Sequence, residues 1–81
     1  MEQIVRTSQQ IGAAIRRHRR SARLSQAELG ARINLRQATI SALERGEPGT
    51  ELRTLIDVMA ALGLEMAVRE RSKAANIEDL F

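Results

Sequence analysis

The stretch that decides the fold is residues 25–46, SQAELGARINLRQATISALERG. Ser25, with a glutamate three residues later, has the pattern of a capping box, which opens a helix. Asn34 tolerates the left-handed backbone of a tight turn. A second helix is expected to begin near Arg36 and to end at Gly46, a residue type favoured just after a helix end. The stretch therefore predicts two short helices joined by a tight turn.

Four positions within this stretch meet the requirements of two helices that cross at a steep angle. Gly30 supplies a small residue where the two backbones approach, and Asn34 supplies the turn. Ile40 and Leu43 supply apolar side chains that the second helix can bury against its neighbours. The four together, between two capping signals, predict a helix-turn-helix over residues 25–46.

Two further helices are expected outside this stretch. Thr7 is predicted to cap a helix over residues 8–22. Its apolar stripe comprises Ile11, Ala14, Ile15, His18 and Ala22. On this pattern His18 is interpreted as a partly buried packing residue rather than a ligand. Thr50 is predicted to cap the last helix, which Gly63 ends. The apolar side chains of that helix are Leu52, Leu55, Ile56, Met59 and Leu62.

Beyond this last helix the apolar period changes from helical to two. Leu64, Met66 and Val68 alternate with other residues, which predicts a strand over 64–70. Because a lone strand leaves its backbone groups unpaired, we expect it to pair with the same strand of a second subunit across a two-fold axis. A frayed extension of the preceding helix is the alternative. Residues 72–81 are expected to be a flexible tail, either with a binding motif or without a role.

Composition limits the class of protein. Eighty-one residues suffice for one domain, expected over residues 1–71. The chain has no cysteine and one histidine, so we expect no disulfide, no metal site and no cofactor. The start of the chain lacks the apolar core of a signal peptide, and no apolar run is long enough to span a membrane. We therefore expect a cytoplasmic protein, located on the nucleoid when bound to DNA.

The charges are unevenly distributed along the chain. Residues 1–36 contain eight arginines against two acidic residues, whereas residues 37–81 contain five basic against eight acidic residues. A basic half joined to an acidic half suits a protein with one face toward a polyanion, although a solvated arginine-rich helix face explains the same numbers. A single aromatic residue, Phe81, disfavours single-strand binding by base stacking. The sequence offers no nucleophile–base pair of the kind that enzymes use, so we do not expect an enzyme.

LSQAELG at 24–30 and QATISALERG at 37–46 resemble the Cro/C1 (XRE) helix-turn-helix family, and the similarity extends over residues 8–63. The chain departs from the commoner pattern at Gly30, where alanine is usual, and at Asn34, where glycine is usual. Both changes keep the physical property that the position needs. The resemblance implies an all-α, four-helix, lambda-repressor-like DNA-binding domain.

The amino end of the second motif helix reaches base edges when that helix lies in the major groove. The expected base-reading residues are Arg36, Gln37, Ala38, Thr39 and Ser41. Arginine can bind guanine and glutamine can bind adenine, each through two hydrogen bonds. The expected phosphate contacts are Ser25, Gln26, Arg16, Arg20 and Arg23. For the arginines, a solvated helix face is the alternative.

The resemblance also assigns Arg19 and Glu44 to a buried ion pair that locks the motif. Arg19 is therefore predicted to be structural rather than DNA-binding. Removing one partner of such a pair typically costs ~3–5 kcal/mol, because it leaves a buried charge without compensation.

Within the family, the chain is most similar to HipB-type antitoxins. The run RQATIS at 36–41 and the segment ALGLEM at 61–66 carry this similarity. It implies a homodimer that binds a palindromic operator in double-stranded DNA, represses its own operon and neutralises a HipA-type kinase toxin. The alternative is a stand-alone transcriptional regulator of the same fold with no toxin partner.

Overall fold

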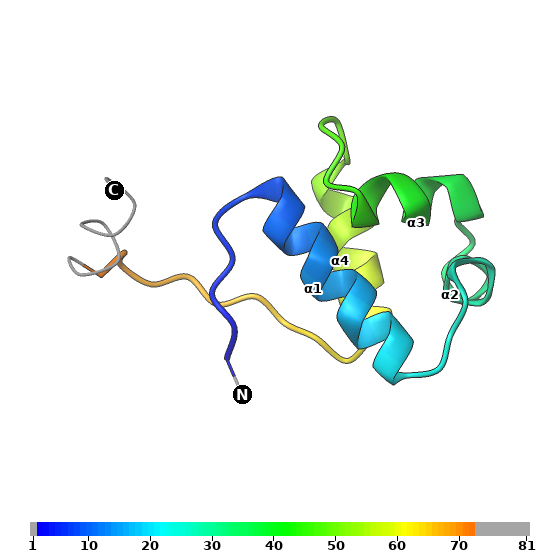
Figure 1. Cartoon of the computed structure of the whole chain (residues 1–81), viewed down its shortest axis with the longest axis horizontal. Coiled ribbons are helices and arrows are strands. Elements are labelled where there is room, and N and C mark those ends of the chain that lie inside the picture. The colour runs from blue at the N-terminus through cyan, green and yellow to red at the C-terminus, as the bar shows by residue number, and fades with distance from the viewer. Residues whose placement is uncertain (1, 73–81) are drawn as a thin grey trace.

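Four helices make up the regular structure of the described chain, and side-chain caps open the first two of them. The computed structural model describes residues 2–72, and the predicted tail lies outside the described residues except for Ser72. The helices are α1 (Ser8–Ser21), α2 (Gln26–Arg32), α3 (Gln37–Glu44) and α4 (Leu52–Ala61). Their arrangement is the predicted all-α helix-turn-helix fold (Figure 1).

Side-chain caps open the first two helices as predicted. The Thr7 side chain accepts a hydrogen bond from the Gln10 amide at 3.0 Å. Ser25 and Glu28 form the complete capping box of α2, with reciprocal hydrogen bonds of 3.0 and 2.9 Å. The predicted Thr50 cap is wrong, because the extended N-cap residue of α4 is Glu51, which makes no side-chain capping bond. The turn before α4 thus ends one residue later than expected.

Each of the four described helices is followed, two residues after its last residue, by a residue with a left-handed backbone. The φ angles are +58° at Asn34, +73° at Gly46 and +71° at Gly63, where the sequence predicted helix ends. The fourth such residue is Arg23, with a φ of +59° at the end of α1. Its amide donates to the Arg20 carbonyl at 2.9 Å, and the next amide donates to the Arg19 carbonyl at 3.2 Å. This is the Schellman pattern, which normally favours glycine.

Two glycines allow helices and turn to approach closely. A Cβ at Gly30 would lie 2.4 Å from the Leu35 carbonyl oxygen, so the predicted need for a small residue there is confirmed. A Cβ at Gly12 would lie 2.5 Å from the Leu43 carbonyl oxygen. Gly12, which the sequence patterns did not single out, is therefore the point where α1 crosses the end of α3.

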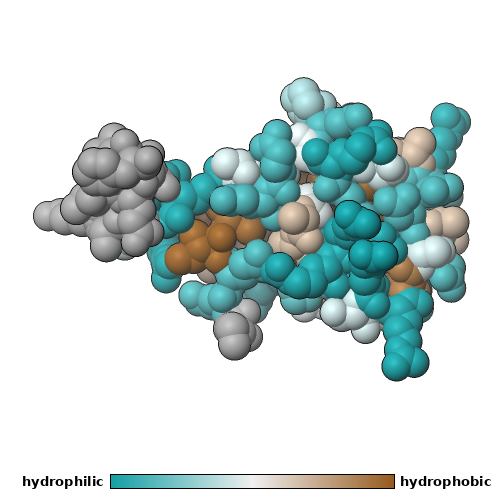
Figure 2. Space-filling view, in the orientation of Figure 1, coloured by the Kyte–Doolittle hydropathy of each residue, from teal (hydrophilic) through white to brown (hydrophobic). Residues whose placement is uncertain are grey.

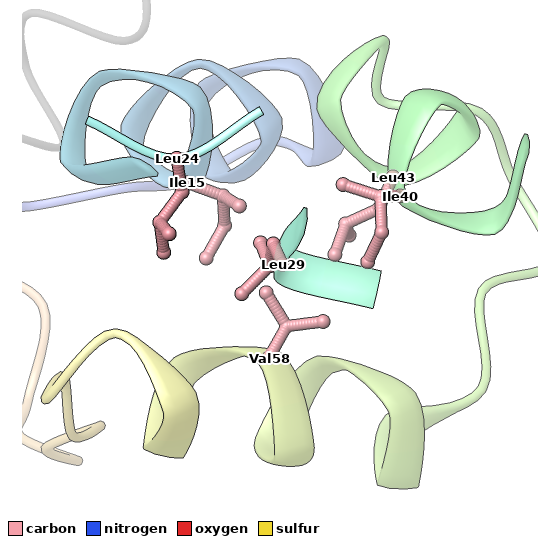
Figure 3. Packing of buried hydrophobic residues seen from close by; sticks show 6 residues of the cluster. All are labelled: Ile15, Leu24, Leu29, Ile40, Leu43 and Val58. Atoms are coloured by element: carbon pink, nitrogen blue, oxygen red, sulfur yellow. The ribbon is translucent and has the colours of Figure 1, made fainter. Parts of the chain in front are cut away.

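The core is aliphatic and lies between all four helices (Figure 3). Its buried members are Ile15, Leu24, Leu29, Ile40, Leu43 and Val58. The burial predicted for Ile40 and Leu43 is thus confirmed. The apolar stripes were less accurate, because α4 buries Val58 while Leu52 and Ile56 are exposed. In α1 the prediction for His18 is wrong: it is exposed, and the neighbouring Arg19 is buried in its place.

Residues 64–72 form neither helix nor strand in the single chain. The left-handed Gly63 ends α4, so the frayed-helix alternative is not what the structure shows. Strand pairing needs a partner strand, and the described part of the chain offers none. Of the described helices, none combines the length and apolar character needed to cross a membrane.

Candidate nucleic-acid interface

The exposed amino-terminal end of α3 carries the predicted base-reading residues. The turn through Asn34 leads from α2 into α3, and α3 packs against both α1 and α2. Arg36, Gln37 and Ala38 are exposed, whereas Thr39 and Ser41 are half-buried. The start of α3 therefore exposes three of the five predicted residues to solvent and leaves the other two half-buried.

Beneath α3, Arg19 and Glu44 lie together as a buried ion pair. Arg19 Nε and Nη2 donate to the two carboxylate oxygens of Glu44 at 2.6 and 3.0 Å. Arg19 Nη1 donates to the Leu24 carbonyl oxygen at 2.6 Å. The hydrogen bond to Glu44 raises the pKa of Arg19 above its ordinary value, against the opposing effect of burial. The pair joins α1, α3 and the segment before α2.

A chain of hydrogen bonds leads from this pair to the surface of α3. Gln26 Nε2 donates to Glu44 Oε1 at 3.1 Å, and Gln37 Nε2 donates to Gln26 Oε1 at 3.3 Å. A carboxylate only accepts hydrogen bonds, so Glu44 determines which end of the Gln26 amide faces it. Gln26 then directs the amide nitrogen of Gln37 toward itself and leaves the Gln37 oxygen available.

A shallow groove between α1 and α3 brings together residues that the sequence predicted for different contacts. Its polar lining includes Arg16, Arg20, Gln26, Ser41 and Arg45. Glu44 lies in the groove, but Arg19 compensates its charge. The groove therefore presents guanidinium groups from both helices next to the Gln26 amide.

Arg45 is a member of this site that sequence reasoning missed. Its guanidinium donates to the Ser41 hydroxyl and to Glu47 Oε1, the latter at 3.0 Å through Nη2. The signal that could have found it is helical spacing, because Gln37, Ser41 and Arg45 are four residues apart and share one helix face.

Six predicted contact residues do not line this groove, namely Arg23, Ser25, Arg36, Gln37, Ala38 and Thr39. Arg23 is exposed at the left-handed end of α1, and Arg36 is the N-cap residue of α3. The Ser25 hydroxyl accepts the Glu28 amide as the cap of α2. The hydrogen bond from the Ser25 amide also lowers the pKa of Glu28. Within residues 2–72, no group of three His, Cys, Asp or Glu side chains is placed to hold a metal ion.

Comparisons with known proteins agree with this geometry. Residues 15–68 match the helix-turn-helix family. A relative from Sinorhizobium fredii (strain NBRC 101917 / NGR234), described as "Uncharacterized HTH-type transcriptional regulator y4dL", is 37% identical over 76 residues, or 91% of this chain. The chain spans only 38% of that relative's length.

Solved structures of similar fold include the "Structure of HipA-HipB-O2-O3 complex" and the "HipB-O4 20mer complex". In each case the TM-score is 0.81 at 28% sequence identity, and the match covers 88% of this chain and 100% of the other. The family match contains α2, α3 and α4 entire, together with the turn between the first two. The protein therefore belongs to the Cro/C1-type (XRE) helix-turn-helix family of DNA-binding transcriptional regulators.

Proposed function

We propose that this protein is an operator-binding repressor and the antitoxin of a HipA-HipB-type module. It binds double-stranded DNA as a homodimer, with α3 of each subunit in the major groove. The observation that carries the proposal is the orientation of Gln37 at the exposed start of α3, imposed through Gln26 by the buried Glu44.

This orientation favours adenine as the base that Gln37 reads. With one N–H directed to Gln26, the Gln37 amide offers one further donor and a free acceptor oxygen. Adenine presents an acceptor at N7 and a donor at N6 in the major groove, which matches that pair. Guanine presents two acceptors, so it suits the guanidinium of Arg36 instead. Ala38, Thr39 and Ser41 complete the proposed base-reading set.

The arginines beside α3 supply the proposed phosphate contacts. Arg16 and Arg20 line the groove next to α3, and Arg23 lies exposed at the end of α1. Ser25 and Gln26 are the neutral members of the predicted phosphate set. Binding that neutralises 6–10 phosphates should weaken by ~10³–10⁵-fold between 50 and 200 mM salt.

A homodimer gives the affinity that one short helix lacks. α3 has eight residues, so it spans about 12 Å along the groove and reads one half-site. Two subunits related by a two-fold axis read a palindrome, with a spacing that the protein sets. In this proposal residues 64–70 of the two subunits pair as strands, with Leu64, Met66 and Val68 on the shared apolar face.

The toxin partner is proposed from the likeness to HipB. One similar structure contains HipA together with HipB, and the match spans that whole chain. The alternative is a stand-alone regulator, and the curated relative, an HTH-type transcriptional regulator much longer than this chain, favours it. A kinase-like gene next to this one, with a product that co-purifies with the protein, supports the antitoxin. Absence of both supports the alternative.

Fluorescence anisotropy tests DNA binding directly. The probe is a labelled duplex from upstream of the protein's own gene, compared with a scrambled duplex of equal length. Arg36→Ala and Gln37→Ala should each weaken binding by roughly tenfold to a hundredfold, since a bidentate base contact contributes about 1–3 kcal/mol. Arg53→Ala is the matched control, because Arg53 lies exposed on α4 beside Asp57. Equal binding by Arg36→Ala, Gln37→Ala and wild type would overturn the proposed readout.

A further inference from the structure

The Ser41 hydroxyl keeps its hydrogen unused on the face of α3 that carries Gln37. Ser41 lies four residues beyond Gln37, about 6 Å further along the helix axis. A helical serine can donate its hydroxyl to the carbonyl four residues earlier, but Ser41 makes no such bond. Among residues 2–72 its hydroxyl has one hydrogen-bond partner, Arg45, which donates to it through Nη1. The O–H hydrogen is therefore available to a further acceptor.

Glu47 holds the opposite edge of the Arg45 guanidinium. Arg45 Nε and Nη2 donate to Glu47 Oε1 at 3.2 and 3.0 Å. The two side chains are more than half exposed, and exposed ion pairs add little to stability. The pair does, however, fix the direction of the guanidinium. With its Nε–Nη2 edge directed to Glu47, the guanidinium turns Nη1 toward Ser41.

We propose that Arg45 is a positioning residue for base readout, which makes Ser41 a hydrogen-bond donor toward the base edge that it faces. This inference rests on the proposed function, in which α3 lies in the major groove. A hydroxyl has one hydrogen and two lone pairs, and Arg45 occupies one of those lone pairs. The positive guanidinium beside the oxygen also favours an acceptor as the next partner and disfavours a base N–H group.

A donor at this position discriminates between bases. In the major groove guanine presents acceptors at O6 and N7, thymine at O4 and adenine at N7, whereas cytosine presents only a donor, its N4 amino group. The half of the molecule that contains α3 is mainly hydrophilic in Figure 2, so hydrogen bonds are expected to govern selection there. Ser41 should therefore disfavour cytosine at the base that it faces.

Charge favours positioning over a direct phosphate contact for Arg45. A phosphate that approached the Nε–Nη2 edge would meet the Glu47 carboxylate already bound there, and juxtaposed like charges repel. Arg16 and Arg20 line the same groove and have no carboxylate partner among residues 2–72. Those two arginines are the better phosphate ligands, and Arg45 is left to act through Ser41.

Selection of binding sites from randomised duplex DNA tests the inference. Ser41→Ala identifies the position that Ser41 faces, where wild type should disfavour cytosine by about twofold to tenfold, the value of one hydrogen bond. Arg45→Ala should lose most of this discrimination, and it should change nothing further in a Ser41→Ala background, because Arg45 acts through Ser41. Arg45→Lys, which keeps a charged donor, should restore part of it. Arg53→Ala is the control and should select as wild type does.

Each other outcome overturns the inference. If Ser41→Ala changes the preference at no position, Ser41 reads no base. If Arg45→Ala keeps the discrimination but lowers the slope of log K against log salt by about 0.9, Arg45 is a phosphate contact. If Arg45→Ala weakens binding to all sequences alike and lowers the melting temperature, its role is only structural. In these three cases an adenine preference at the Gln37 position leaves the proposed function standing, whereas a wild type that selects no sequence overturns both.

Discussion

Replacing Arg19 with methionine isolates the contribution of the buried ion pair. Methionine keeps an unbranched apolar stem but donates none of the three hydrogen bonds that Arg19 gives to Glu44 and Leu24. The Glu44 side chain, 3% exposed, is then left with Gln26 as its hydrogen-bond donor. Breaking one partner of a buried pair costs about 3–5 kcal/mol.

That cost is a large fraction of the stability of a domain this small. An 81-residue chain has a free energy of unfolding of roughly 4–12 kcal/mol at 0.05–0.15 kcal/mol per residue. The melting temperature should fall by about 12 °C or more, because 1 kcal/mol shifts it by 4–8 °C at this size. The assay is thermal unfolding followed by far-UV circular dichroism at one fixed protein concentration, since dimerisation makes the midpoint concentration-dependent.

Arg20→Met is the matched control for this measurement. Arg20 is exposed on the same helix, so its loss should change stability by about 0.5 kcal/mol or less. Arg19→Met with Glu44→Leu should cost less than Arg19→Met alone, because no buried charge is left uncompensated. If Arg19→Met had the melting temperature of wild type but lost DNA affinity, Arg19 would be a DNA contact and the structural assignment would be wrong.

Three smaller perturbations test other parts of the structure. Arg23→Gly should stabilise the folded protein by about 1 kcal/mol, since a side chain in the left-handed region costs 1–2 kcal/mol. In operator titrations the same variant should also lower the slope of log K against log salt by about 0.9 per lost phosphate contact. A lower melting temperature would contradict the first part. Gly12→Ala should destabilise by roughly 1–3 kcal/mol in urea unfolding, because its Cβ would press on the Leu43 carbonyl, and wild-type stability would refute that contact. Because the pKa of Glu28 is lowered in the folded protein, its carboxylate contributes stability at pH values above its ordinary pKa of 4.5. This contribution is lost as the pH falls through the lowered pKa. When the urea midpoint is plotted against pH, Glu28→Gln should reduce its fall at acid pH. An unchanged fall would show that other carboxylates cause the loss of stability.

Local features were predictable because neighbouring residues determine them. The capping box at Ser25, the turn at Asn34 and the helix end at Gly46 each depend on a few adjacent residues, and all three agree with the structure. The family motif likewise predicted the order of helices and the exposed start of α3. Those parts of the site needed no knowledge of how distant elements pack.

Features that depend on contacts between distant elements were missed. Gly12 is needed only because the end of α3 crosses α1 there. Apolar periodicity wrongly placed His18 on the buried face, and the burial of its neighbour Arg19 beside Glu44 was predicted by the family resemblance rather than by periodicity. Helical spacing could have placed Arg45 on the same face as Gln37 and Ser41, but its position beside the arginines of α1 follows only from the packing of α1 against α3. Residues 64–70 need a second chain before their predicted strand can form.

The ion pair and the proposed base readout depend on the same carboxylate. Glu44 accepts from Arg19 on one side and orients Gln26, and through it Gln37, on the other. Apolar replacement of a buried pair is often neutral for stability, so stability alone gives little reason to keep these charges. The Arg19→Met, Glu44→Leu double variant should therefore fold but hold the Gln26 amide in no fixed orientation. We expect it to select sites from randomised duplex DNA with a weaker adenine preference at the Gln37 position, while its salt dependence stays that of wild type. An unchanged adenine preference would show that Gln37 is oriented by the DNA itself, and the link between core and readout would be broken.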